Sequence, residues 1–149
     1  MPDGAPTVGL IRYRELAGYK YQLVEDAGFA TGIRLDVPVE IPGYGRMEMD
    51  GALLIKAGYC WSGPSGPAID TRNFLRASMA HDFLYQCLRT RRLGERFRAP
   101  ADALMRHICI EDGMSRFRAW YAWAAVRAFA GYAARPDGAE GQEVVRTAP

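Results

Sequence analysis

The sequence predicts an α+β fold in which a small antiparallel β-meander precedes three helices. Three observations predict this class. The first part of the chain alternates short apolar runs with glycine and proline, the second half repeats apolar residues at helical spacing, and a Gly/Pro-rich stretch separates the two. A chain of 149 residues suits one domain with a single core. We expect this domain to span 1–135 and a polar tail to follow at 136–149.

Four apolar segments within residues 8–57 predict the strands of the meander. They are rich in Val, Ile, Leu and Tyr and partly alternate with polar residues. In chain order they read VGLIRYREL, KYQLVED, IRLDVPVEI and MEMDGALLIKAG. The intervening stretches EDAGFATG and IPGYGRM contain the glycine and proline typical of turns. The following segment, 58–71, contains YCWSGPSGPAIDT from Tyr59 on, which is too rich in glycine and proline to be regular.

Three helices are expected over residues 72–134. Their boundaries are predicted by residues that favour helix ends, namely Thr71, Pro100, Gly113 and Ser115. The first two helices are expected to pack antiparallel across the arginine-rich linker TRRLGERFRA, which we predict to be solvated or to lie against anionic groups. The third helix is heavy in aromatic residues, which predict core plus a partner surface or, alternatively, a membrane interface.

The composition excludes several classes of protein. Apolar residues make up 49% of the chain and charged residues 24%, and a net charge of +2 gives no reason to expect specific nucleic-acid binding. Three cysteines without CxxC spacing predict neither a disulfide framework nor a zinc site. We see no signal-peptide pattern, and no apolar run approaches the ~18 residues of a transmembrane helix.

The first helix carries a histidine in its apolar stripe. His81 falls at the i, i+3, i+4 spacing of the apolar residues, Tyr85 lies one turn further on that face, and Asp82 is rotated off it by roughly a quarter turn. A neutral imidazole takes a proton from water most effectively when a carboxylate holds its other nitrogen. An antiparallel second helix would bring Asp102 opposite His81, within reach of Tyr85.

These residues also have a structural interpretation. A histidine on an apolar face is usually a core residue with a satisfied hydrogen bond. Asp102 lies near the start of a helix, where an acidic residue stabilises the helix dipole by ~0.3–1 kcal/mol. The combination of His81, Asp82, Tyr85 and Asp102 with the upstream Gly/Pro loop leaves both the catalytic and the structural interpretation open.

The pattern YCWSGPSGPAID … AHDFLYQ … PADALM resembles two known groups of proteins. The first is secreted phospholipase A2, with the related phospholipase domain of parvovirus capsids, in which a glycine-rich loop precedes a His-Asp-x-x-Tyr helix and a later Asp. The second is a phage and prophage family of unknown function with the motifs W-x-G-x-S-G-P-x-I-D, HDxLY and AD. The present sequence lacks the phospholipase disulfides, and its N-terminal strands have no counterpart in the phospholipase pattern.

The phospholipase resemblance implies a role for each matching residue. His81 would be the base, Asp102 its orienting partner, and Tyr85 the support of Asp102. A calcium ion would be held by oxygen ligands, namely the Asp82 carboxylate and backbone carbonyls around Tyr59, Gly63 and Ser65.

Taken together, the two resemblances imply a phage or prophage hydrolase of the virion or host cytoplasm that cleaves a lipid ester of the bacterial envelope. Its partners would be membrane lipid or other virion proteins. The alternative is a non-catalytic virion component, in a tail or neck, that uses HDxxY as a buried polar network.

Overall fold

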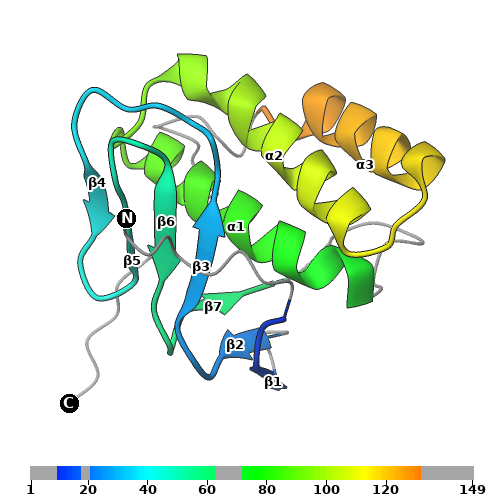
Figure 1. Cartoon of the computed structure of the whole chain (residues 1–149), viewed down its shortest axis with the longest axis horizontal. Coiled ribbons are helices and arrows are strands. Elements are labelled where there is room, and N and C mark those ends of the chain that lie inside the picture. Colours follow the sequence, from blue (N-terminus) through cyan, green and yellow to red (C-terminus); the bar gives the residue numbers. More distant parts are fainter. Residues whose placement is uncertain (1–9, 18–20, 63–71, 132–149) are drawn as a thin grey trace.

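The computed structural model describes residues 10–17, 21–62 and 72–131, and over these residues the chain has the predicted α+β class (Figure 1). The described part contains seven short strands followed by three α-helices and a short 3₁₀ helix. All strand pairs are antiparallel. The predicted C-terminal tail lies outside the described residues.

The strands form two small sheets rather than the one predicted. The first sheet has the order β1-β2-β7 and consists of β1 (Tyr13–Glu15), β2 (Tyr21–Leu23) and β7 (Cys60–Trp61). The second has the order β3-β6-β5-β4 and consists of β3 (Ala27–Ala30), β4 (Val39–Ile41), β5 (Gly45–Met47) and β6 (Ala52–Ile55). Strands β4, β5 and β6 form an antiparallel meander, and β3 joins the outer side of β6. Strand β5 lies in IPGYGRM, which the sequence predicts to be a turn.

Pairing with distant strands decides where the strands lie. Strand β3 occupies part of EDAGFATG, which the sequence predicts to be a turn, because it pairs with β6 and buries Ala27 and Phe29. Strand β7 lies in the segment predicted to be irregular and pairs with β2. Conversely, IRLDVPVEI is a strand only at its last three residues, β4. Residue type alone did not reveal these elements, because cross-strand partners stabilise them.

The helices lie close to their predicted positions. They are α1 (Arg72–Arg89), the 3₁₀ helix η1 (Glu95–Phe97), α2 (Arg98–Glu111) and α3 (Arg116–Phe129). Ser115 caps α3 as predicted, since its hydroxyl accepts a hydrogen bond from the Arg118 N–H at 3.2 Å. Helix α2 starts before Pro100 because η1 leads directly into it, and α3 ends before residue 134. Thr71 lies outside the described residues.

Helix α1 is the centre of the molecule. It lies between the sheets and α2, and α3 packs on the far side of α2 (Figure 1). Most of its residues from Phe74 on are buried. On one side the Trp61 indole N–H donates to the Ser78 hydroxyl at 3.1 Å, and on another side Phe83 packs over β5. None of the described helices is long and apolar enough to cross a bilayer.

The pairing of α1 with α2 is antiparallel. At one end the buried Arg76 side chain donates to both carboxylate oxygens of Asp112, at 2.9 and 3.0 Å, and to Glu111 at 2.9 Å. At the other end the Arg98 Nε donates to the Tyr85 hydroxyl at 3.2 Å. Residue numbers therefore rise on one helix as they fall on the other. This register places the centre of α1 opposite the first turns of α2.

Glycine is required where Phe83 meets β5. A Cβ at Gly45 would lie 2.7 Å from the Leu54 carbonyl oxygen and 2.7 Å from the Phe83 ring. Neither neighbour can retreat easily, because one is backbone of the adjacent strand and the other is a fully buried ring. We expect Gly45→Ala to lower the free energy of unfolding by about 1–3 kcal/mol through overpacking, measured by urea denaturation.

The matched control is Gly94→Ala, because a Cβ at Gly94 would meet no atom within 4 Å. This variant should unfold at the wild-type urea concentration or slightly above it. Equal denaturation midpoints for the two variants would contradict tight packing of α1 on β5.

Candidate active site

The residues of the predicted catalytic pair meet at the centre of α1. His81 Nε2 lies 2.7 Å from Asp102 Oδ1, across the interface between α1 and α2. The Tyr85 hydroxyl donates to the same carboxylate oxygen, also at 2.7 Å. The rings of His81 and Tyr85 overlap, with centroids 4.1 Å apart, because the two residues are one helical turn apart on one face. The structure thus brings together the three residues to which the sequence assigns the chemistry.

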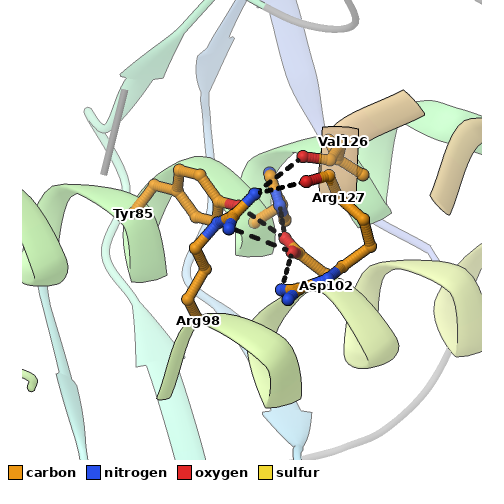
Figure 2. Close-up of polar contacts among 6 residues, drawn as sticks. Tyr85, Arg98, Asp102, Val126 and Arg127 are labelled. Carbon is orange, nitrogen blue, oxygen red and sulfur yellow. Dashed lines mark hydrogen bonds and ion pairs between the residues drawn. The ribbon is translucent and has the colours of Figure 1, made fainter. Parts of the chain in front are cut away.

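The second oxygen of Asp102 is held from α3. Arg127 Nη1 donates to Asp102 Oδ2 at 2.8 Å, and Arg98 Nε approaches this oxygen to 4.0 Å (Figure 2). The sequence predicts neither arginine as a site residue, and it places Arg98 in a solvated linker. Arg98 is instead the first residue of α2, and its side chain is only 14% exposed.

Arg98 joins all three helices at this point. Its Nη2 donates to the carbonyl oxygens of Val126 and Arg127, at 3.1 and 2.9 Å, while its Nε donates to Tyr85 (Figure 2). The two carbonyls belong to the last turn of α3, and the Val126 carbonyl also accepts the Ala130 N–H at 2.9 Å. The sequence contains one local signal that Arg98 lies near the site. Arg98 precedes Asp102 by four residues on α2, so the two side chains share one face of the helix. For Arg127 we find no such local signal.

The Asp102 carboxyl is ionised although it is completely buried. Burial alone would oppose ionisation, but hydrogen bonds from His81, Tyr85 and Arg127 outweigh it and hold the pKa of Asp102 below its usual range. Burial, together with the hydrogen bond to Asp102, raises the pKa of the Tyr85 phenol, so this hydroxyl keeps its proton and donates it. Asp102 is therefore a fixed negative charge at neutral pH.

This charge determines which nitrogen of His81 is a base. An ionised carboxylate only accepts hydrogen bonds, so the network assigns the imidazole proton to Nε2 and the lone pair to Nδ1. No hydrogen-bond partner of Nδ1 is found in the part of the chain that the structure describes, and the His81 side chain retains 8% exposure.

The four predicted calcium ligands have different outcomes. Asp82 is only partly exposed, and its carboxylate has no hydrogen-bond or ion-pair partner among the described residues. The Tyr59 carbonyl already accepts the Leu23 N–H at 2.8 Å, as part of the first sheet. Gly63 and Ser65 lie outside the described residues. Over the described ranges no three His, Cys, Asp or Glu side chains group as a metal site.

Asp82 is the electrostatically unusual carboxyl of this region. Burial raises its pKa to about 6, although the positive charges of a protonated His81 and of Arg89 work in the opposite direction. A partly buried carboxylate without a partner is the donor that a cation would stabilise. Of the two described candidates, the Asp82 carboxylate has no hydrogen-bond or ion-pair partner among the described residues, whereas the Tyr59 carbonyl oxygen already accepts one hydrogen bond.

The raised pKa of Asp82 predicts a pH-dependent cost to stability. The folded protein keeps this proton up to about pH 6, whereas the unfolded chain releases it near 3.8, so wild-type stability falls as the pH rises through that window. Asn cannot ionise. In chelator, we expect Asp82→Asn to gain on wild type between pH 4 and 6 and to be more stable by up to about 3 kcal/mol at pH 7. Urea unfolding at each pH measures this, and a pH-independent difference would contradict it.

Comparison with known proteins finds a family similar to part of this chain. Residues 67–126 match a family described as "Protein of unknown function (DUF1353)". The chain matches no curated protein and no solved structure. The matched segment contains His81, Asp102 and most of α3, and its description assigns no activity. The helical half of this protein, with the candidate site, is therefore similar to a family whose function is unknown.

Proposed function

We propose that the protein is a hydrolase that cleaves an ester by attack of water, with His81 as the base. The observation that carries this proposal is the 2.7 Å contact between His81 Nε2 and Asp102 Oδ1, combined with an Nδ1 atom that has no hydrogen-bond partner among the described residues. Only one of the two ring nitrogens is committed to the protein, which leaves the other for a water molecule.

The proposed reaction follows from this tautomer. A water hydrogen-bonded to Nδ1 attacks the ester carbonyl carbon and transfers a proton to His81 as the new C–O bond forms. The ionised Asp102 stabilises the resulting imidazolium. As the tetrahedral intermediate collapses, the alcohol oxygen leaves and takes the proton back from Nδ1. The products are a carboxylic acid and an alcohol, and His81 returns to its starting state.

We propose a lipid ester as the substrate, in the envelope of a bacterium attacked by a phage or carrying a prophage. The HDxxY helix and the upstream Gly/Pro segment support this assignment through their resemblance to phospholipases. The exposed side of α3 is also suited to a lipid surface, since Phe117, Trp120 and Tyr121 are all more than one-third exposed and Arg116 adjoins them. The protein would act from the virion or the host cytoplasm.

A divalent cation, with calcium as the leading candidate, is part of this proposal. Asp82 would hold it, and the cation would supply positive charge to the oxyanion of the intermediate. The absence of a partner for the Asp82 carboxylate within the described residues supports this assignment.

A non-catalytic virion component, in a tail or neck, is the second candidate. The observation that favours it is the complete burial of Asp102, whose bonds reach residues of α1 and α3 from its own position on α2. Such a network fixes helix packing whether or not any turnover occurs. In this role the exposed aromatic side chains of α3 would contact other virion proteins.

Hydrolysis of phospholipid vesicles by wild type and His81→Gln distinguishes the two candidates. We expect the substitution to lower the rate by at least about 100-fold, because a general base contributes on the order of 10²–10⁴. His107→Gln is the matched control, since the His107 side chain is 70% exposed and lies away from the site. Equal hydrolysis by wild type and His81→Gln would eliminate the catalytic role and favour the structural candidate.

Calcium should act through Asp82. We expect added calcium to raise the thermal unfolding midpoint of wild type, because a ligand that binds only the folded state stabilises it. Asp82→Asn should show no such increase. Differential scanning calorimetry with calcium and with chelator measures both proteins, and the same calcium-induced shift in each would remove Asp82 from the proposed cation site.

A further inference from the structure

We propose that Arg127 is a positioning residue of this site: it reaches across from α3 and fixes the orientation of the Asp102 carboxylate toward His81. The catalytic consequence of this inference rests on the proposed function. The contact itself does not, because it depends only on how α3 packs on α2.

The hydrogen bonds of Asp102 divide between its two oxygens. His81 and Tyr85 share Oδ1, whereas Arg127 Nη1 holds Oδ2 at 2.8 Å. In the described ranges Arg127 is the only residue that makes a hydrogen bond to Oδ2, because Arg98 Nε stays at 4.0 Å from it. Without Arg127, a buried anionic oxygen would lose its donor. The carboxylate would then be free to rotate, and either Oδ1 or Oδ2 would face His81 Nε2.

Arg98 does not take the place of Arg127, because its Nε and Nη2 donate to other groups. Its Nε donates to Tyr85 and its Nη2 donates to the Val126 and Arg127 carbonyls. These bonds hold the last turn of α3 against α2, at the height where the Arg127 side chain reaches Asp102. The fit is close, since a Cβ at Gly131 would lie 3.0 Å from the Arg98 Cζ. Arg98 thus places the helix, and Arg127 places the carboxylate.

The exposure of the two partners makes this role testable. Asp102 is completely buried, whereas the Arg127 side chain is 34% exposed and extends from the surface to the carboxylate. Truncation to Ala should therefore leave an opening from solvent to Oδ2. A small guanidinium ion has the planar donor geometry of the missing group and should enter it.

The experiment compares Arg127→Ala and Arg127→Lys with the surface control Arg34→Ala, an exposed arginine in the segment between β3 and β4. The activity-independent readout is the proton NMR signal of the His81 Nε2–H that is bonded to Asp102. We expect Arg127→Ala to weaken this signal and millimolar methylguanidinium to restore it, while Arg127→Lys keeps part of it. In vesicle hydrolysis, Arg127→Ala should lower kcat by about 10- to 100-fold with little change in KM, and methylguanidinium should recover part of the loss.

Each outcome decides the proposal. An unchanged Nε2–H signal in Arg127→Ala overturns it. A lost signal that neither methylguanidinium nor the Lys variant recovers also overturns it, because the loss then reflects packing alone. If the Ala variant does not fold, Arg127→Gln takes its place, and an unchanged signal there overturns the proposal. If wild type hydrolyses no lipid ester, the proposed function fails while the NMR comparison still tests the positioning role.

Discussion

The buried negative charge of Asp102 is the constraint on which the helical half of this protein depends. An ionised carboxylate without solvent contact must receive hydrogen bonds from the protein, since removing one partner of a buried ion pair costs about 3–5 kcal/mol. The donors come from two other helices: His81 and Tyr85 from α1, and Arg127 from α3. A single side chain of α2 therefore specifies how its neighbours on both sides pack, and the three helices are bound together at the candidate site.

The network around Asp102 suits both a structural role and the proposed chemistry, and the two roles differ at one atom. Every polar group around Asp102 is engaged in a way that a stabilising cluster would also require. Nδ1 of His81 is different, because it has no hydrogen-bond partner among the described residues. A network that served packing alone would have no need for an uncommitted basic nitrogen. This asymmetry is why we favour a base over a purely structural histidine.

The sheets act on the site indirectly, by holding α1. The Trp61 indole donates a hydrogen bond to Ser78, and Phe83 packs against Gly45. Helix α1 therefore contacts one sheet just before His81 in the sequence and the other sheet just after it. With α1 held in this way, His81 cannot move away from α2 without disturbing the core. At the far end, the ion pairs of Arg76 with Asp112 and Glu111 fix the same helix lengthwise. His81 is thus positioned by the fold as much as by its immediate hydrogen bonds.

Local patterns in the sequence determined the class of the fold, the three helices, the Ser115 cap and the shared face of His81 and Tyr85. Each of these depends on residues within one or two helical turns, which the order of residues records directly. The meeting of His81 with Asp102 was also predictable, because a short linker makes neighbouring helices antiparallel. Tertiary structure alone decided that β3 and β7 form strands, because their partners are distant, and that Arg127 of α3 completes the site. Contacts between residues far apart in the chain leave no periodic trace, so the sequence could not reveal the donor that holds the second oxygen of Asp102.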